Sequence, residues 1–323
     1  MKDVSVIIPT FKRVTQTLKT IGCILNSVGK NKQFKLEIIV SDSSPDNLLQ
    51  DAIKNEYGKK IIYVRPQSPG VSTGKNKGAQ VANGKFIIFC DSDIELESDT
   101  IIQLLNTLNS PTVAAVTGRV IWKGGEKDKQ VDIPQKADRI IKIGNVSYIE
   151  SIYSRYLATY KKLFWDVGGY DETVFNMRGE GADLSIRYWK MGFPLAINTS
   201  ITAYHIFNAP DSIALRTQNP QWAIAKDLLL LALKYDLLEG NSPNFSHTLN
   251  NIFSQYGEYS HYNILQGIGK NLDFITQVKP IIDKQKQNMK IRYAFKFLEV
   301  FSDDKLFKEC IQNASKILNS LKK

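Results

Sequence analysis

Two kinds of hydrophobic pattern alternate along the first 120 residues. Continuous, β-branched apolar runs predict strands buried on both faces, and they cover residues 4–8, 36–40, 61–64, 86–90 and 113–121. Between them, apolar residues recur at helical spacing over residues 14–28, 70–83 and 98–108, and a further helix opens at 44–46. This alternation predicts an α/β fold with a doubly wound, mostly parallel sheet.

The pattern changes after residue 123. Residues 124–142 are polar and mixed in charge, which predicts an exposed loop, and order returns from 146 to about 205. Beyond residue 210 we expect no further strands. The remaining helical patterns cover 223–238, 245–256, 264–278, 290–301 and 305–321. We therefore predict an α/β domain over residues 1–210 and an all-helical C-terminal subdomain over residues 211–323.

Composition narrows the class of protein. The 323 residues are 43% hydrophobic and 23% charged, as in globular proteins, and the net charge of +10 favours an anionic ligand or an anionic membrane surface. The three cysteines lack CxxC spacing, which argues against a disulfide framework or a zinc ribbon and favours a reducing compartment. The longest apolar stretch, 228–233, is far shorter than a membrane span of about 20 residues, so we expect a cytoplasmic protein.

Polar residues follow three of the predicted strands. Residues 9–11 follow the first strand, Asp42 follows the second, and the D-x-D sequence 91–93 follows the fourth. Because ligands of open parallel sheets bind at the carboxyl ends of the strands, these side chains are candidates for one site. Asp91 and Asp93 offer oxygen ligands that suit Mg²⁺ or Mn²⁺ shared with phosphates. Many D-x-D sequences occur by chance, and the position after a buried strand strengthens this one.

The glycine-rich segment 70–84 precedes that buried strand. Its glycines allow close backbone approach, and Lys75 and Lys77 can face phosphate oxygens near a helix N-terminus. The same pattern is typical of an amphipathic helix with solvated lysines, and the segment alone favours that second interpretation.

Five segments in this order resemble the family-2 glycosyltransferases of the GT-A fold. VSVIIPTFKR (4–13) is similar to the opening strand and nucleotide loop of that family, and EIIVSDSS (37–44) to its second strand. Residues 74–93 resemble its A-R-N-x-G helix, buried strand and D-x-D motif. GGYDE (168–172) resembles its acceptor segment, and residues 179–192 resemble its G-E-D-x-D-L helix. The resemblance covers about residues 2–210.

The resemblance implies a role for each matching residue. Donor binding would fall to Pro9, Thr10, Phe11, Arg13, Asp42, Lys75, Asn76, Asp91, Ser92 and Asp93. A metal ion, Mn²⁺ or Mg²⁺, would be held by Asp91, Asp93 and His205, since the family carries a late histidine at this place. The binding site for the acceptor would be lined by Trp165, Gly168, Gly169, Tyr170 and Asp171.

The resemblance also implies the reaction. We expect an inverting, metal-dependent hexosyl- or N-acetylhexosaminyltransferase that uses a nucleotide-diphosphate sugar, with UDP as the favoured nucleotide. The acceptor would be a glycan, a lipid-linked glycan or a polypeptide, and no nucleic acid is expected as a partner. The basic helical tail is the segment expected to recognise the acceptor, to self-associate, or to contact the inner face of a membrane.

Two positions depart from the family pattern. Lys75 replaces the usual arginine, so any phosphate contact becomes that of a point charge rather than a bidentate fork. Gly181 replaces the aspartate that usually acts as general base. Glu180 and Asp183 are the carboxylates left there, and we place Asp183 slightly ahead as the base. The alternative for Asp183 is an ion pair within the helix with Arg187, four residues on.

Other classes of protein fit the sequence less well. A sugar nucleotidyltransferase would carry a glycine-rich loop after the first strand, and a dehydrogenase would carry G-x-G-x-x-G there. The chain has PTFKR at that place. A non-catalytic module that binds nucleotide sugars remains as an alternative, because the aspartate missing at Gly181 is compatible with it.

Overall fold

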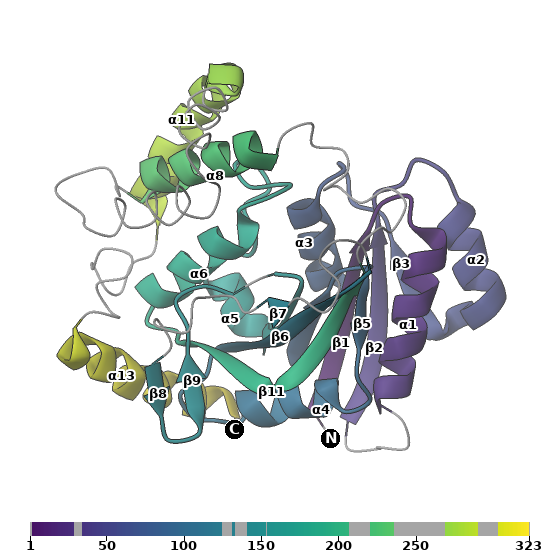
Figure 1. Cartoon of the computed structure of the whole chain (residues 1–323), viewed down its shortest axis with the longest axis horizontal. Coiled ribbons are helices and arrows are strands. Elements are labelled where there is room, and N and C mark those ends of the chain that lie inside the picture. The colour runs from purple at the N-terminus through teal and green to yellow at the C-terminus, as the bar shows by residue number, and fades with distance from the viewer. Residues whose placement is uncertain are drawn as a thin grey trace.

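The computed structural model describes residues 2–28, 34–124, 131–132, 141–152, 154–206, 220–235, 269–289 and 303–322. Its strands are β1 (Lys2–Thr10), β2 (Phe34–Asp42), β3 (Ile61–Val64), β4 (Phe86–Cys90), β5 (Ile94–Leu96), β6 (Ala115–Lys123), β7 (Val131–Asp132), β8 (Ile141–Ile143), β9 (Val146–Tyr148), β10 (Tyr156–Tyr160) and β11 (Leu195–Ile206). They form one sheet in the order β3-β2-β1-β4-β10-β6-β11-β9-β8, with β5 beside β11 and β7 beside β6 (Figure 1).

The core of this sheet is mostly parallel, as the sequence predicts. Strands β3, β2, β1 and β4 pair in parallel, and so do β6 and β11. The antiparallel strand β10 lies between β4 and β6. Thr10 pairs with Asp42 in the β1–β2 ladder, so the carboxyl ends of the first strands lie side by side. These ends define the edge of the sheet that carries the candidate site.

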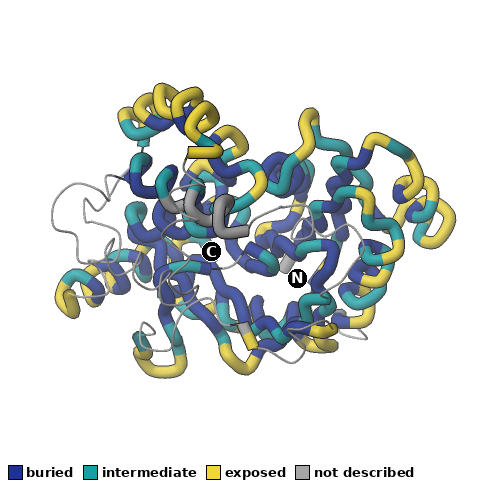
Figure 2. The backbone as a smooth tube through the Cα atoms, turned by 45° about the horizontal axis from the view of Figure 1, so that its top comes forward, coloured by how far each residue is buried: buried dark blue, intermediate teal, exposed yellow. Residues whose placement is uncertain are grey.

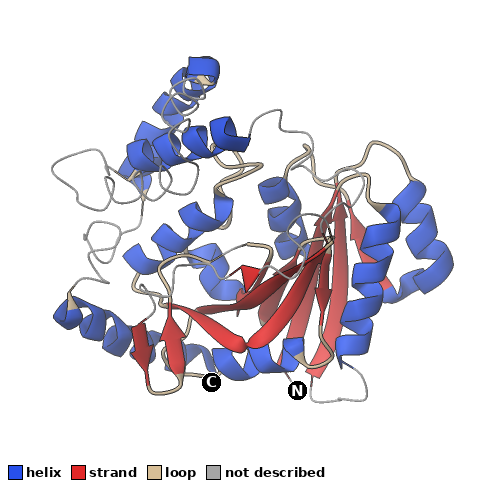
Figure 3. Cartoon of the chain, in the orientation of Figure 1, coloured by secondary structure: helices blue, strands red, loops and turns tan. Residues whose placement is uncertain are grey.

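Helices cover both faces of the sheet (Figure 3). They are α1 (Val14–Val28), α2 (Leu48–Tyr57), η1 (Gly58–Lys60), α3 (Val71–Val81), α4 (Thr100–Leu108), α5 (Lys161–Asp166) and α6 (Glu180–Lys190). Helix α3 packs closely on β1 and β2. A β-carbon at Gly78 would lie 2.3 Å from Ile7 Cγ2, so this glycine permits the close approach. The buried strands form the dark core in Figure 2.

The segment predicted as an exposed loop, 124–142, is partly regular. It contributes the two-residue strand β7, which pairs with β6, and the start of β8, which pairs with β9. The expectation of an irregular loop is wrong at these positions, because short edge strands obtain their hydrogen bonds from a neighbour and need little hydrophobic pattern of their own. Val131 and Ile143 are correspondingly exposed.

The described part of the C-terminal region is helical. It contains α8 (Pro220–Lys234), α11 (Leu272–Asn288) and α13 (Asp304–Lys322). Helices α8 and α11 share a hydrophobic cluster with Val174, Phe175 and Ile186, whereas α13 packs into the main core near Tyr148 and Trp189. The helices predicted at 245–256 and 290–301 lie outside the described residues. Over the described ranges, no helix is both long and apolar enough to cross a membrane.

Candidate active site

The D-x-D segment is fixed by hydrogen bonds to three other elements. Asp91 N–H donates to the carbonyl of Arg155, over 2.7 Å, and Ile206 N–H donates to the carbonyl of Asp93, over 2.9 Å. On the other side, the Thr20 hydroxyl donates to the Ser92 carbonyl, over 2.9 Å. Ser92 is buried, and the role in donor binding expected of it stays a prediction. The two aspartates are therefore held in fixed positions beyond the end of β4.

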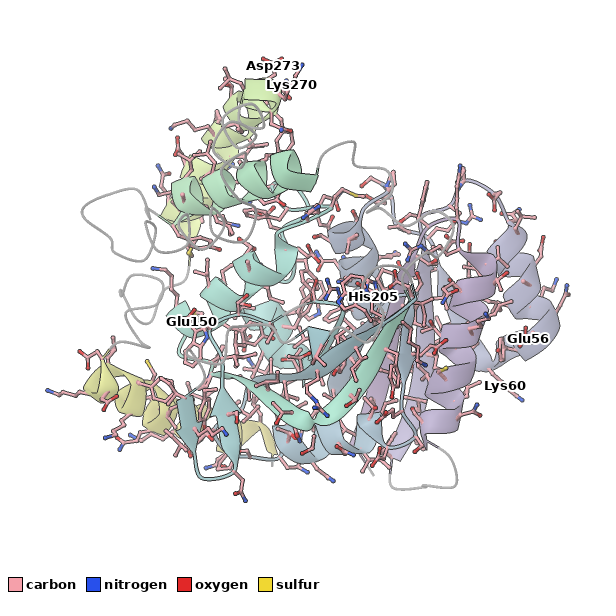
Figure 4. The ribbon with its side chains drawn as sticks, viewed as in Figure 1. Glu56, Lys60, Glu150, His205, Lys270 and Asp273 are labelled. Atoms are coloured by element: carbon pink, nitrogen blue, oxygen red, sulfur yellow. The ribbon has the colours of Figure 1, made fainter. Side chains whose placement is uncertain are left out.

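Asp93 lies between two groups that favour its ionised form. Its Oδ2 accepts a hydrogen bond from Arg13 Nη1 over 2.6 Å and lies 3.3 Å from His205 Nε2. Burial opposes ionisation, but His205 and Arg13 outweigh it and hold the pKa of Asp93 at about 2. Figure 4 labels His205 near the upper ends of the central strands. Three segments predicted from the family resemblance thus meet at one carboxylate.

This arrangement fits a divalent cation held by two protein ligands. Asp93 supplies an ionised oxygen and His205 supplies a ring nitrogen beside it, which is a donor set suited to Mn²⁺. Within the described residues, no group of three or more His, Cys, Asp or Glu side chains forms a complete metal cage. The remaining ligand positions would have to come from diphosphate oxygens and water. Asp91 points instead toward a neighbouring ammonium group.

That ammonium group belongs to Lys75, which is wholly buried. Its Nζ donates to the Ser154 carbonyl over 2.8 Å and lies 3.2 Å from Asp91 Oδ1 and 3.5 Å from Glu180 Oε1. Burial raises the pKa of Asp91 to about 6, although the Lys75 charge opposes this. The Ser154 hydroxyl also donates to Glu180 Oε1. Lys75 therefore links the D-x-D segment to the first turn of α6. The contact between Lys75 and phosphate that the sequence predicts stays a prediction.

The predicted nucleotide loop lies over the ends of β1 and β2. Asp42 is fully buried and accepts hydrogen bonds from Ser44 at Oδ1 and from the Tyr63 hydroxyl, over 2.8 Å, at Oδ2. Burial and this bond raise the pKa of Tyr63 to about 12. Thr10 is also buried, and its hydroxyl pairs with that of Thr17 over 2.9 Å. Pro9 and Phe11 are partly exposed and remain accessible to a ligand.

The predicted acceptor segment is a tight glycine turn. Gly168 and Gly169 have φ of +92° and +67°, and a β-carbon at Gly169 would lie 2.9 Å from the Trp165 ring. Arg187 Nη1 donates to the carbonyls of Val167 and Gly169, over 2.6 Å each. Only glycine adopts this turn without strain.

Asn76 ties the following residues to α3. Its Oδ1 accepts from Tyr170 N–H over 2.9 Å, and its Nδ2 donates to the Tyr170 carbonyl and to Glu172 Oε1 over 2.9 and 2.7 Å. The role in donor binding expected of Asn76 therefore stays a prediction. Asp171 Oδ1 accepts from the N–H groups of Thr173 and Val174, over 3.0 Å each. Tyr170 is buried, and the centre of its ring lies 5.4 Å from Lys75 Nζ.

Asp183 is fully buried with both carboxylate oxygens engaged. Oδ2 lies 2.5 Å from Arg187 Nη2, which is the i+4 ion pair weighed from the sequence. Oδ1 lies 2.6 Å from Lys234 Nζ and accepts from the Tyr235 hydroxyl over 2.7 Å. Burial opposes ionisation, yet Arg187 and Lys234 hold the pKa of Asp183 below its ordinary value. The geometry makes Asp183 an anchor for Arg187 and leaves Glu180 nearer to the D-x-D segment.

Gly181 has no room for the side chain it replaces. A β-carbon at this position would lie 2.9 Å from the Ile152 carbonyl oxygen and 3.3 Å from Ser154 N. The backbone of Ile152 and Ser154 thus occupies the place where an aspartate would start.

The structure brings two further residues to the site that sequence reasoning missed. Ser154 holds Lys75 and Glu180, and Lys234 connects Asp183 to Asp171, whose Oδ2 lies 2.7 Å from its Nζ. Neither residue lies in a motif. The only sequence signal for Lys234 is a lysine that follows the apolar run 228–233 of a helix, which is also typical of a solvated helix end.

Comparison with protein families finds one family model. The model for Glycosyl transferase family 2 matches residues 5–168, about half of the chain. A Campylobacter jejuni GalNAc(5)-diNAcBac-PP-undecaprenol beta-1,3-glucosyltransferase is 26% identical over 268 residues, which are 80% of this chain and 83% of that protein. The Staphylococcus aureus poly(ribitol-phosphate) beta-N-acetylglucosaminyltransferase TarP is 25% identical, with 64% of each chain covered. The chain spans only 12% of the Bacillus subtilis minor teichoic acid biosynthesis protein GgaB, to which it is 33% identical over 108 residues.

Two solved structures share the fold. The mannosyltransferase PcManGT from Pyrobaculum calidifontis, solved with GDP-Man and Mn²⁺, has a TM-score of 0.54 at 14% identity and covers 99% of this chain and 86% of its own. GalNAc-T7, solved with UDP, GalNAc and Mn²⁺, has a TM-score of 0.53 at 18% identity over 64% of this chain and 44% of its own. These likenesses confirm the GT-A type of sheet that the sequence predicts.

Proposed function

Because this chain belongs to glycosyl transferase family 2, we propose that it moves a sugar, with inversion, from a nucleotide-diphosphate donor to a glycan, lipid-linked or polypeptide acceptor. The observation that carries the proposal is the position of Asp93, which lies between Arg13 and His205 beyond the ends of β1, β4 and β11. A diphosphate needs positive charge at this place. Arg13, whose Nη1 pairs with Asp93, brings part of it, and a cation held by Asp93 and His205 would supply the rest. We favour UDP as the nucleotide, as the resemblance of residues 37–44 to the family implies. Structures of the same fold were solved with UDP and with GDP-Man, so both nucleotides enter the test.

Mn²⁺ or Mg²⁺ fits Asp93 and His205, and two structures of the same fold were solved with Mn²⁺. When bound, the cation would neutralise the negative charge that develops on the leaving diphosphate. Arg13 orients Asp93 through a 2.6 Å hydrogen bond and keeps it ionised. Lys75 places a second positive charge behind Asp91, which lowers the repulsion between this carboxylate and an incoming phosphate.

The acceptor must lose a proton as it attacks the anomeric carbon. We propose that Glu180 takes this proton, because it stands in the first turn of α6 within 3.5 Å of the Lys75 ammonium that also contacts Asp91. Its Oε1 is held by Ser154. Asp183, which the sequence placed ahead of Glu180, would instead position the turn 167–169 through Arg187. The new bond forms on the face opposite the diphosphate, which leaves with the electron pair of the broken bond.

Hydrolysis of the donor without acceptor tests this proposal. The full chain is incubated with UDP-, GDP- and dTDP-sugars, with Mn²⁺ or with a chelator, beside Asp93→Ala. We expect Mn²⁺-dependent release of one nucleotide diphosphate that Asp93→Ala loses. Asp283→Ala changes an exposed carboxylate of α11 and is the control. If neither hydrolysis nor Mn²⁺-dependent nucleotide binding occurs, the proposed function is wrong.

We also propose a cytoplasmic location with peripheral contact to an anionic membrane, and self-association through the helical tail. Support for the membrane contact comes from the net charge of +10 and from the exposed apolar side chains Leu272 and Phe274 on α11. Sedimentation with anionic lipid vesicles, compared with neutral ones, tests the membrane contact. The molar mass measured by light scattering tests self-association.

A further inference from the structure

A cavity of about 550 Å³ lies between the acceptor turn and the C-terminal helix α11. One wall is formed by Trp165 and the turn 166–168, and the opposite wall by α11, from Ile281 to Asn288. Its volume falls within the range of about 300–1,000 Å³ that is typical of small-molecule sites. The family model ends at residue 168, so the α11 wall lies outside the segment that this model matches.

The two walls are held together by a hydrophobic cluster. Ile275, Val278 and Ile282 of α11 are buried against α8 and against Val174 and Phe175, which directly follow the acceptor segment. A buried ion pair of 2.7 Å between Lys234 and Asp171 joins α8 to the acceptor segment, and both residues line the cavity. The cavity is therefore a fixed feature of the packing rather than a gap between loosely connected parts.

The lining combines two aromatic rings, those of Trp165 and Tyr170, with planar polar groups, and it also contains cationic and apolar side chains. Trp165 supplies an indole, Gln285 and Asn288 supply amides, and Asp166 and Glu172 supply carboxylates. Among the described residues, the buried Gln285 Oε1 has no hydrogen-bond partner, so an acceptor atom in the wall is available to a donor. A ligand ring with C–H groups on one face could stack on the Trp165 indole. Hydroxyl groups at the edge of the same ring could hydrogen-bond to the amides and carboxylates of the lining. Sugars have this combination of surfaces, whereas an acyl chain would leave the polar groups without partners.

The cavity lies next to the reaction centre proposed above. Tyr170 lines the cavity, and its ring lies 5.4 Å from Lys75 Nζ, which contacts Asp91 and Glu180. Glu172 lines the cavity as well and accepts from Asn76 of α3. The side chains of Tyr170 and Lys75 thus lie between a saccharide in the cavity and the carboxylates of Asp91 and Glu180.

We propose that this cavity binds a saccharide unit of the acceptor, beside the sugar or group that receives the transferred residue. The proposal rests on the proposed function and narrows the acceptor to one that already carries carbohydrate. Trp165 stacks on the face of the sugar, and the amides of Gln285 and Asn288 on α11 form hydrogen bonds with the hydroxyl groups of the sugar. Asn288 Nδ2 already donates to the Lys284 carbonyl over 3.0 Å, which leaves Oδ1 and one N–H for the ligand.

Binding of free disaccharides to the full chain tests the proposal. Cellobiose, N,N′-diacetylchitobiose and mannobiose are the probes, and saturation-transfer NMR and calorimetric titration are the measurements. We expect one of them to bind the wild type, and the double variant Gln285→Ala/Asn288→Ala to bind it at least about tenfold more weakly, as the loss of two hydrogen bonds implies. Alanine favours a helix over both original residues, so α11 should stay folded.

A matched control and a second variant keep the result interpretable. Gln287→Ala removes an exposed amide of the same helix that does not line the cavity, and should bind like the wild type. Trp165→Ala should also weaken binding if it folds. The proposal is wrong if no disaccharide binds, or if the double variant binds as tightly as Gln287→Ala. Because these measurements need neither donor nor metal, their failure is distinct from absent donor hydrolysis.

Discussion

Lys234 Nζ lies 2.6 Å from Asp183 Oδ1 and 2.7 Å from Asp171 Oδ2, and all three side chains are buried. A lysine of the C-terminal helix α8 thus neutralises two carboxylates of the glycosyltransferase core. One of these orients Arg187, which holds the carbonyls of the turn 167–169. The shape of the turn 167–169 therefore depends on a residue outside the segment that the family model matches.

Removal of that lysine should destabilise the whole chain. Lys234→Met leaves two buried carboxylates without their shared counter-charge, and we expect the free energy of unfolding to fall by about 3–5 kcal/mol. Urea unfolding measures the change. Lys279→Met breaks an exposed i,i+4 pair with Asp283 and should lower stability by less than about 1 kcal/mol. Equal effects of the two substitutions would contradict the role of Lys234.

Restoring the carboxylate that the family usually carries at position 181 should not restore a base. In Gly181→Asp, the β-carbon would meet the Ile152 carbonyl oxygen at 2.9 Å, so the backbone at Ile152 and Ser154 must shift away from Lys75 and Glu180. We expect a lower thermal midpoint, a loss of about 1–3 kcal/mol, and no rise in turnover.

Gly181→Ala separates the steric effect of the β-carbon from the effect of the added carboxylate, and Gly22→Ala is the control. Gly181→Ala should be destabilised like Gly181→Asp, because both carry the β-carbon. A β-carbon at Gly22 of α1 would meet no atom of the described residues within 4 Å, so Gly22→Ala should be neutral or slightly stabilising. A stable, faster Gly181→Asp enzyme would show that the backbone at Ile152 yields easily.

The sequence predicts what local pattern controls. Helix 14–28 and strands 61–64 and 86–90 have the predicted bounds, because helical spacing and continuous apolar runs fix them locally. The pair Asp183–Arg187 is likewise a matter of i+4 spacing. Lys234 lies 51 residues from Asp183 and no motif marks it, so only the packing of α8 shows the contact. The lack of space at Gly181 also depends on a residue distant in sequence, because the Ile152 carbonyl oxygen fills it. The sequence shows only that the usual carboxylate is missing at this position.

Asp227 of α8 should make stability depend on pH. Lys226 Nζ and Arg178 Nε lie 3.5 and 3.6 Å from its oxygens, and burial raises its pKa to about 6. The folded chain therefore binds this proton more tightly than the unfolded chain, where the pKa is about 3.9. Its contribution to stability is complete below about pH 4 and is lost as the pH rises through about 6.

Substitution of Asp227 by asparagine tests this sign. At pH 7.5 we expect Asp227→Asn to be more stable than the wild type by about 1–3 kcal/mol, with a difference that shrinks toward pH 4. Asp283→Asn, on the exposed face of α11, should show no such trend. Thermal midpoints of the three proteins between pH 4 and 8 give the answer, and a gap that is constant across this range would disprove the assignment.

Replacing Glu180 and Asp183 by the corresponding amides should affect different properties, turnover in the first case and stability and acceptor binding in the second. Glu180→Gln keeps the shape and the bond from Ser154 but removes the base, so we expect transfer to slow by about 10²–10⁴-fold. Asp183→Asn weakens the pairs with Arg187 and Lys234, so it should lower the thermal midpoint and raise the acceptor KM more than it lowers kcat. Steady-state kinetics and unfolding on the same preparations separate the two effects. If Glu180→Gln kept more than about a tenth of wild-type turnover while Asp183→Asn lost it at an unchanged thermal midpoint, the base would be Asp183.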